Sequence, residues 1–324
     1  MPARHDFDPT VLEKIELLQK KYAAMGQDLN AYLDGLLYAD YLTYWDYINL
    51  DTLLSLQNPI TPFPDESIFI IYHQITELYF KLSLHEFDQL AEEAPTTAQP
   101  MIERIRRVNR YFEALTHSFD IMVDGMDPAQ FMKFRMSLLP ASGFQSAQYR
   151  KIEIRSTTFD RLLHADHRER HVNHSAGDLE ALFDHIYWKA GAVELATGNK
   201  TLTLRQFEKK YGGELLELAE NSFEVNARAL WNDLAREEQT DELREQLRWL
   251  DIHVNINWPL SHYKSAVRYL QRDPEDIAAT GGTNWQKYLP PRFQKRVFFP
   301  ELWTEQELSE WGKAWVKKEV FGLA

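Results

Sequence analysis

Apolar residues recur at helical spacing along nearly the whole chain, and this periodicity limits the possible fold more than any other feature. A spacing of three to four residues places side chains on one face of an α-helix. Alternating patterns, which are typical of half-buried strands, are rare and short. Glycine (13 residues) and proline (14 residues) are scarce among the 324 residues, which favours long helices with few turns. We therefore predict an all-α fold.

The sequence contains no internal repeat, no low-complexity segment and no linker that would divide it. With 9 Trp, 15 Tyr and 18 Phe, and 44% hydrophobic residues, it can bury a large core. We predict a single helical domain that spans residues 1–324. The expected helical segments are two helices within 9–58, then 65–92, 97–123, 128 to about 140, most of 176–248 with a turn or short strand at 197–204, and 259–272.

Charge and cysteine content exclude several classes of function. A net charge of −13 argues against a nucleic-acid or anionic-membrane surface, and we read the basic run 104–110 as a solvated helix face. The absence of cysteine excludes disulfides, iron–sulfur clusters, thiolate haem ligands and thiol nucleophiles. No apolar run has the length of a membrane span, and the N-terminus lacks the apolar region of a signal peptide. We expect a soluble cytoplasmic protein.

One histidine lies within the large apolar residues of the helix predicted at 65–92. Phe69 and His73 are four residues apart, so their rings share a face of this helix, one turn apart. A buried imidazole needs a hydrogen-bond partner or must face a cavity. Taken alone, the segment favours a core histidine with satisfied hydrogen bonds.

A second helix repeats this four-residue spacing with an arginine. Asp127 and Pro128 form a strong helix-start signal, and Phe131 and Arg135 share a face of the helix that follows. The planar guanidinium of arginine can donate two parallel hydrogen bonds to a carboxylate. An aromatic-lined pocket with one arginine and one neutral histidine would suit a zwitterionic aromatic ligand.

The other histidines leave alternatives open. His164, His167, His171 and His174 have offsets that would place them on one helix face, but the segment is highly charged and lacks an apolar shell. We favour an exposed polar segment there over a metal site. His253 and His262 remain candidates for an axial metal ligand, and spacing alone does not choose between them.

Motifs of other enzyme classes are missing from the sequence. It has no glycine-rich phosphate motif, no Gly-x-Ser-x-Gly elbow and no Glu-x-x-His pair of the kind that di-iron bundles use. The loop at 279–283 has two glycines that would let backbone approach a ligand closely.

Ordered blocks between about residues 35 and 303 resemble the haem-dependent tryptophan 2,3-dioxygenase family. The blocks are Tyr44-x-x-Tyr47-Ile-x-Leu-Asp, Phe69-Ile-Ile-Tyr-His73-Gln-x-x-Glu77-Leu, Phe131-x-x-Phe-Arg135, Pro140-Ala-Ser-Gly-Phe-Gln-Ser-x-Gln-Tyr-Arg150-x-Ile-Glu, Trp258-x-x-x-His262-x-x-x-x-Val-Arg268, Thr280-Gly-Gly and Phe298-Phe-Pro-Glu-Leu-Trp303. The second and fourth blocks are highly specific when they occur together.

The resemblance implies an all-α fold with a pocket for haem b, in which His262 is the axial ligand of the iron. Ferrous haem with an open distal position binds O₂. His73 is then the catalytic distal residue, close to the indole N–H of L-tryptophan. Ser142 and Gly143 are implied to line the haem edge.

The same resemblance implies how the substrate is held. Arg135 would bind the substrate carboxylate, while Thr280 and a haem propionate would hold the ammonium group. Phe69 and Phe131 would enclose the indole. The remaining implied pocket residues are Ile70, Ile71 and Tyr72, together with Tyr44, Tyr47 and Ile48 from a neighbouring subunit.

The implied assembly is a homotetramer built as a dimer of dimers, with the helices of residues 9–58 reaching a neighbouring subunit. The implied reaction inserts both atoms of O₂ across the indole C2–C3 bond and gives N-formyl-L-kynurenine, the entry to the kynurenine pathway of tryptophan catabolism.

The sequence departs from the family pattern at a few positions. Tyr72 stands where many members have Gln, Ala279 stands where Gly is usual, and the stretch between Arg268 and Thr280 is longer than usual. A related haem enzyme acting on another indole, a haem or tryptophan sensor without turnover, and a helical interaction protein are the alternatives.

Overall fold

The computed structural model describes residues 8–138, 143–168, 170, 175–194, 197–270 and 295–313. By its internal contacts the chain divides into two units, Met1–Gln57 and Asn58–Ala324. The prediction of a single domain over residues 1–324 stays a prediction, and we describe each unit by itself.

The N-terminal unit contains four helices where the sequence indicated two: α1 (Pro9–Ala24), α2 (Leu29–Leu37), α3 (Tyr44–Tyr47) and α4 (Leu50–Leu54). None of them contains a buried residue. Many of their large apolar side chains are exposed, and Tyr41 is 99% exposed. These helices therefore bury no core of their own.

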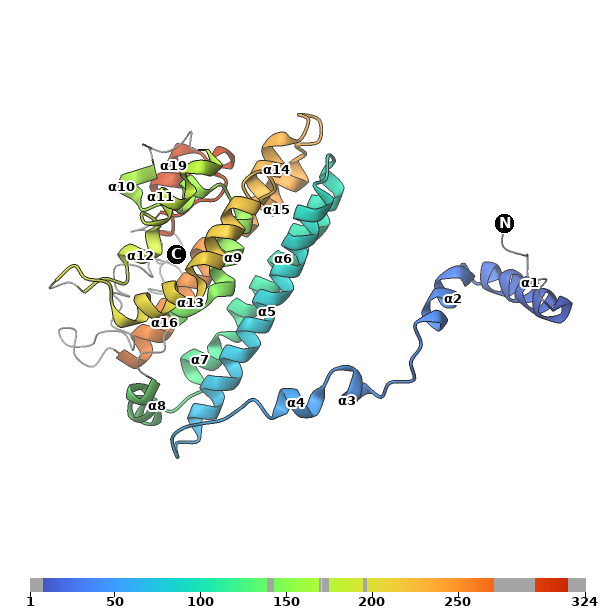
Figure 1. Cartoon of the computed structure of the whole chain (residues 1–324), viewed down its shortest axis with the longest axis horizontal. Helices are drawn as coiled ribbons and strands as arrows, with labels where there is room; N and C mark the ends of the chain where they lie inside the picture. Colours follow the sequence, from blue (N-terminus) through green and yellow to red (C-terminus); the bar gives the residue numbers. More distant parts are fainter. Residues whose placement is uncertain are drawn as a thin grey trace. The chain divides into compact units, whose positions relative to one another are not determined.

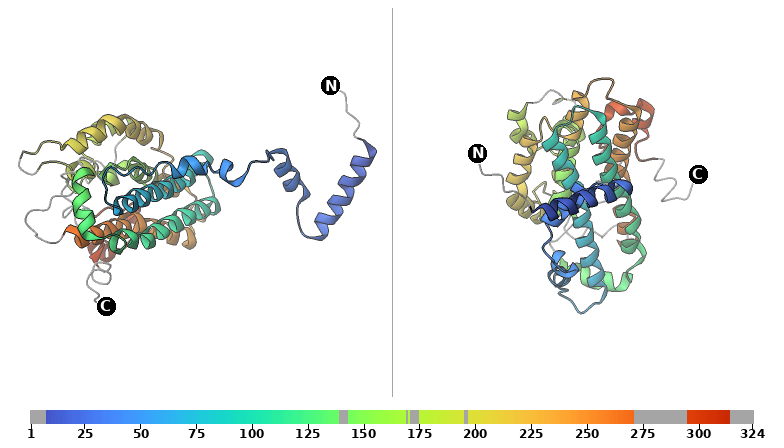
Figure 2. Two further views of the ribbon diagram at one scale, coloured as in Figure 1. Left: turned by 90° about the horizontal axis from the view of Figure 1, so that it is seen from below. Right: turned by 90° about the vertical axis from the view of Figure 1, so that its right-hand side faces the viewer.

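The larger unit is built around long helices that pack side by side (Figures 1 and 2). Helix α5 (Asp65–Glu93) packs against α6 (Ala98–Ser118) on one side and against α9 (Ala147–Ser156) on another. Helix α6 also packs on α15 (Asp241–Ile252), and α9 packs on α13 (Leu202–Asn221). The helix predicted at 65–92 and the all-α fold are confirmed: in the described ranges only two isolated β-bridges form, and no strand.

Helix α6 illustrates how the periodicity produces this packing. Its apolar stripe is buried, and the buried members are Met101, Ile102, Ile105, Val108, Phe112 and Leu115. The opposite face carries the basic run, where Arg104 pairs with Glu86 at 3.4 Å and with Glu93 at 2.8 Å. The interpretation of this run as a helix face is confirmed.

Shorter elements complete the unit. They are α7 (Asp120–Asp124), α8 (Pro128–Phe134), the 3₁₀ helices η1 (Arg135–Leu138), η2 (Gly143–Gln145), η3 (Phe159–Leu162), η4 (Ala176–Asp178) and η6 (Pro300–Leu302), and α10 (Ala165–Arg168), α11 (Leu179–Phe183), α12 (Tyr187–Ala190), α14 (Ala227–Asp233) and α19 (Glu305–Ser309). The helix expected at 97–123 is divided between α6 and α7. The region expected as turn or strand contains the bridge between Val193 and Lys200, with Gly198 at φ +70°, before α13 begins.

Helix α15 continues through a π-helical turn, η5 (His253–Asn257), into α16 (Trp258–Leu270). Pro259 is the second residue of α16, two positions after the end of this turn. Proline has no N–H to donate, and its ring crowds the carbonyl four residues earlier. A π-turn is one way for a helix to accommodate such an interruption. The predicted helix at 259–272 is thus the second half of a longer helical run.

The carboxylate of Asp251, near the end of α15, holds the segment that follows residue 294. Its two oxygens accept hydrogen bonds from the backbone N–H groups of Phe298 (2.6 Å) and Phe299 (3.0 Å), from Trp303 Nε1 (3.0 Å) and from Asn255 Nδ2 (2.9 Å). One buried carboxylate of α15 therefore anchors residues 298–303 through side-chain hydrogen bonds.

No helix in the described part of the chain is both long and apolar enough to span a lipid bilayer.

Candidate active site

His73 is held by the turn of α5 that precedes it. Its Nδ1 lies 2.7 Å from the carbonyl oxygen of Phe69, and because a carbonyl only accepts, Nδ1 carries the proton. The other ring nitrogen, Nε2, is then the acceptor in the neutral imidazole. Burial lowers the pKa of His73 below its usual value, so the ring is neutral at pH 7. A neutral ring with a basic Nε2 can accept a hydrogen bond from a ligand N–H.

A continuous set of aromatic rings from three helices begins at this imidazole. The centroid of Phe69 lies 4.1 Å from that of His73, 6.4 Å from that of Phe131 and 5.9 Å from that of Phe134. Phe131 in turn lies 4.8 Å from Tyr269 of α16. The structure thus brings together Phe69, His73 and Phe131, as the sequence suggested, and adds Phe134 and Tyr269.

The start of α8 is tied to the start of α5. Asp127 caps α8 by accepting a hydrogen bond from the N–H of Ala129 at 2.8 Å, which confirms the predicted start signal. The N–H of Asp127 donates to Asp65 Oδ2 at 2.6 Å, and the N–H of Asp65 donates to Gln130 Oε1 at 3.3 Å. These bonds fix the position of the helix that carries Phe131.

Arg135 begins the 3₁₀ turn at the end of α8. The residue is only 5% exposed, and its Nη1 contacts the sulfur of Met132 at 3.9 Å. Burial lowers the pKa of the guanidinium, which nonetheless stays charged at neutral pH. A buried guanidinium one turn beyond Phe131 has the chemistry needed to bind a carboxylate.

His262 lies on α16 between two aromatic rings. The ring centroids of Phe119 and Trp258 are each 4.6 Å from the centroid of its imidazole, and Nδ1 is 3.3 Å from the carbonyl oxygen of Trp258. The pKa of His262 is lowered to about 4, first by burial and then by the charged form of His73. The two histidines, from α5 and α16, are therefore close enough to influence each other.

The alternative axial ligand, His253, faces a different part of the molecule. It lies in the π-turn, with Asn257 Nδ2 at 3.3 Å from Nδ1 and its ring stacked on Trp249 at 5.5 Å. The groups that affect its pKa, after burial, are Glu113 and His117 of α6. The ring contacts of His262 lead through Phe119 and Tyr72 to His73, which favours His262 over His253 as a partner in one site.

Neighbouring residues of α5 point in several directions. Tyr72 is 3% exposed, and its hydroxyl lies 3.3 Å from the carbonyl oxygen of Leu115, to which it donates, and 3.1 Å from Ser118 Oγ. The hydroxyl therefore reaches into the α5–α6 interface. Ile70 is half-buried, and Ile71 is 43% exposed on the surface of the helix.

The remaining predicted site residues lie in other places. Gly143 begins η2 and is exposed, while Ser142 and Thr280 lie outside the described residues, as does Ala279. Tyr44, Tyr47 and Ile48 belong to the N-terminal unit and are 69%, 74% and 36% exposed.

The structure describes only part of the four-histidine segment. Helix α10 covers only residues 165–168; His164 precedes it, and His171 and His174 lie outside the described residues. His167 instead stacks on His185, with centroids 4.1 Å apart. Within the described ranges, no group of three or more potential ligands could hold a metal ion.

Sequence reasoning missed the role of Phe119 and Trp258. Trp258 had a local signal, since it precedes His262 by four residues and shares its helix face. Phe119 had none, because it lies between α6 and α7 and reaches His262 only through the tertiary fold.

The fold and the pair of neutral imidazoles among aromatic rings define an all-α protein with a candidate binding site formed by α5, α8 and α16. Residues 36–177 match the family model of tryptophan 2,3-dioxygenase. Curated relatives named tryptophan 2,3-dioxygenase include one from Bradyrhizobium sp., 32% identical over 271 residues (81% of this chain and 91% of the relative). Others come from Bacillus thuringiensis, 30% identical over 268 residues (81% and 91%), and Pseudomonas fluorescens, 30% identical over 272 residues (82% and 91%). The chain belongs to the tryptophan 2,3-dioxygenase family, whose members are oxidoreductases.

Proposed function

We propose that the protein is a haem-dependent L-tryptophan 2,3-dioxygenase, which inserts both atoms of O₂ across the indole C2–C3 bond to give N-formyl-L-kynurenine. The observation that carries the proposal is the chain of ring contacts from His73 through Tyr72 and Phe119 to His262, which joins the two neutral histidines of α5 and α16 within one set of aromatic rings. The family membership supplies the reaction, and this geometry supports the proposed roles.

The residues around His262 fit a b-type haem. An axial histidine ligand must be neutral and is commonly oriented by a hydrogen bond from its other nitrogen to a carbonyl. His262 meets both conditions, because its pKa is about 4 and its Nδ1 faces the carbonyl oxygen of Trp258. Phe119 and Trp258 add apolar ring surface beside it. Bound ferrous haem would supply the site at which O₂ is activated.

His73 would hold the indole. Because Nδ1 is engaged by the Phe69 carbonyl, Nε2 is the atom that accepts the indole N–H. This hydrogen bond orients the ring and draws electron density toward C2 and C3, the atoms that are oxidised. Phe69 and Phe131 enclose the indole and keep water from it.

Arg135 would bind the carboxylate of tryptophan through its planar guanidinium. In this proposal Thr280 and a haem propionate hold the ammonium group, while Ser142 and Gly143 line the haem edge. A substrate without a carboxylate cannot accept the two parallel hydrogen bonds of a guanidinium and forgoes this charge-assisted contact. The site therefore favours tryptophan over simple indoles.

Exposed apolar surfaces support the proposed homotetramer. Ile71, Ile75, Leu78 and Leu82 form an exposed stripe on α5, each between 37% and 49% exposed. The N-terminal helices α1–α4 expose still more apolar side chains and bury none. Burial of such surfaces against other copies is the usual outcome. We propose that Tyr44, Tyr47 and Ile48 reach the pocket of a neighbouring subunit.

The experiment that tests the function uses purified, haem-loaded ferrous protein with tryptophan and O₂. Formation of a product that absorbs as N-formylkynurenine is expected, and its absence with saturating tryptophan would refute the proposal. His262→Ala should lose haem, whereas Arg135→Ala should keep haem and lose mainly tryptophan affinity. Haem retention in His262→Ala would shift the ligand assignment to His253. Equal turnover of indoles without a carboxylate would favour the related indole oxygenase.

A further inference from the structure

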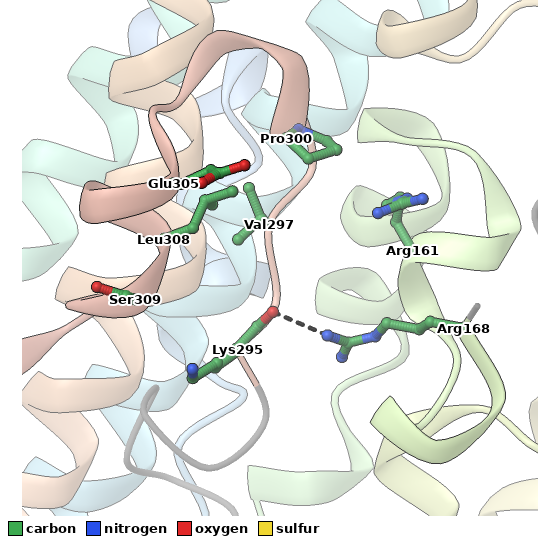
Figure 3. Close-up of a pocket in the computed structure, with 8 residues that line it drawn as sticks. All are labelled: Arg161, Arg168, Lys295, Val297, Pro300, Glu305, Leu308 and Ser309. Carbon is green, nitrogen blue, oxygen red and sulfur yellow. Dashed lines mark hydrogen bonds between the residues drawn. The ribbon is translucent and has the colours of Figure 1, made fainter.

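A cavity of about 400 Å³ lies between the η3–α10 region and the C-terminal segment. Figure 3 shows Arg161 and Arg168 on one side of it, facing residues of α19 and the segment before it on the other. The lining residues are Arg161, Arg168, Lys295, Val297, Pro300, Glu305, Leu308 and Ser309. None of them belongs to the candidate active site, and Figure 1 places α10 and α19 at the end of the body opposite α8.

The lining has an excess of positive charge, in a chain whose net charge is −13. Arg161 is compensated, since its Nε donates to the buried Asp160 Oδ2 at 2.7 Å. Among the described lining residues, Glu305 is the only carboxylate. Arg168 and Lys295 together therefore exceed it by one positive charge.

In the described part of the chain, the hydrogen bonds of the Arg168 side chain go to neutral carbonyl groups. Its Nε donates to the carbonyl oxygen of Leu163 at 2.8 Å, and its Nη1 donates to that of Lys295 at 2.8 Å, the contact drawn in Figure 3. Its Nη2 is buried and has no hydrogen-bond partner among the described residues. The guanidinium is thus fixed in position by two bonds, and the second hydrogen of Nη1 remains as a donor for an acceptor.

A second group of cations lies behind this one. Arg150 and Arg296 share the single buried carboxylate of Glu153, through contacts that also include the Tyr187 hydroxyl. Burial, followed by the charges of Arg296 and Arg161, lowers the pKa of Arg168 to about 10. A bound anion would offset this repulsion.

The rest of the lining selects the type of anion. Val297, Pro300 and Leu308 give the cavity an apolar side. A volume of this size holds a small organic molecule, and apolar walls with a few fixed polar groups are typical of such sites. We propose that the cavity binds a small organic carboxylate, with its carboxylate on Arg168 and its apolar part against Val297 and Leu308.

The test uses 4-fluorobenzoate as the probe and ¹⁹F NMR of the haem-loaded protein. Saturable binding is expected in the wild type, with a Kd on the order of 1 mM for so small a ligand. Arg168→Gln should weaken binding at least tenfold. Glu305→Gln should strengthen it about twofold, because it removes a repelling carboxylate.

Two further variants distinguish binding in this cavity from binding at the candidate active site. Leu308→Trp fills the apolar side of the cavity but keeps every cation, so it should abolish binding of the probe. Its circular dichroism spectrum should stay unchanged. This variant tests the proposal even if Arg168→Gln does not fold. Arg135→Leu removes the other carboxylate-binding arginine and should leave the cavity's affinity unchanged. Loss of binding in Arg135→Leu, or full binding in Leu308→Trp, would overturn the proposal. Displacement of the probe by inorganic phosphate as readily as by cyclohexanecarboxylate would overturn the preference for an organic anion.

Discussion

Phe119 packs against the imidazole of His262 with their ring centroids 4.6 Å apart. The same ring meets Tyr72 of α5 edge-on at 5.6 Å and Trp258 at 5.2 Å. One phenylalanine between α6 and α7 therefore joins the helix that carries His73 to the helix that carries His262. Its ring therefore belongs to the contacts that hold these two helices together at the candidate site.

Truncation of Phe119 should loosen this contact. Phe119→Ala should lower the free energy of unfolding by about 3–5 kcal/mol, whereas Phe119→Leu should cost about 1 kcal/mol because it keeps most of the volume. Urea unfolding measures both, and haem retention should fall in the same order. Ile121→Ala, at a position 44% exposed two residues away, is the matched control and should change stability by less than about 0.5 kcal/mol. Equal losses of unfolding free energy in Phe119→Ala and Ile121→Ala would contradict this packing role of Phe119.

Tyr72→Phe should affect stability more than catalysis. The hydroxyl bonds to the Leu115 carbonyl and Ser118 inside the α5–α6 interface, so its removal should cost about 1 kcal/mol of unfolding free energy. The value of kcat/KM for tryptophan should stay within about twofold of wild type, a difference of about 0.4 kcal/mol in transition-state stabilisation. A tenfold loss of kcat/KM would mean that the hydroxyl takes part in the substrate pocket after all.

Arg135→Lys should separate binding from chemistry. Lysine keeps the charge but loses the planar pair of donors, so kcat/KM for tryptophan should fall by roughly 10- to 100-fold, mainly through KM. Binding of tryptamine, which has no carboxylate, should be unaffected in a spectroscopic titration. Lys133→Met, at an exposed position two residues away, serves as the control with no expected effect. If tryptophan and tryptamine lose affinity equally, Arg135 acts structurally.

His253 should make the protein sensitive to acid. Burial lowers its pKa to about 4, with Glu113 and His117 as the facing titratable groups, against about 6.5 in the unfolded chain. The folded state thus binds fewer protons, and stability present above pH 6.5 is lost as the pH falls toward 4. The loss should reach about 2 kcal/mol between pH 7 and pH 5. Urea unfolding at pH 7 and pH 5 measures this loss. Between these pH values, the free energy of unfolding of His253→Gln should fall by about 2 kcal/mol less than that of the wild type.

Asp251 should change the stability of the protein with pH in the direction opposite to His253. Burial raises the pKa of Asp251 from the ordinary value of 3.8 to about 6, although its carboxylate accepts four hydrogen bonds. The folded protein therefore holds the proton of Asp251 more tightly than the unfolded chain does. Its contribution to stability therefore increases as the pH falls from about 6 to 4. Asp251→Asn should remove this trend and, because an amide nitrogen then faces N–H donors, lower stability at pH 7 by about 3 kcal/mol. A stable variant with an unchanged pH profile would contradict the anchoring role of Asp251.

Local sequence patterns determined the elements and several pairs of residues. Helical periodicity predicted α5 and the all-α fold, the Asp127–Pro128 signal predicted the start of α8, and the four-residue spacing paired Phe69 with His73. These features depend on residues within one or two turns of one another, and backbone geometry alone relates them. Helix ends were less predictable: the helix expected at 97–123 divides, because α6 stops at Ser118 and α7 begins at Asp120.

Tertiary structure decided what each helix face meets. His253 and His262 are equivalent as residues on one helical run, yet only His262 meets Phe119 and is coupled to His73. Similarly, the hydroxyl of Tyr72 reaches α6, and the charges around Arg168 come from segments more than a hundred residues apart. Periodicity specifies which side of a helix is buried, but the partner on that side depends on the packing of distant segments. That packing separates the proposed haem ligand from a histidine of the core.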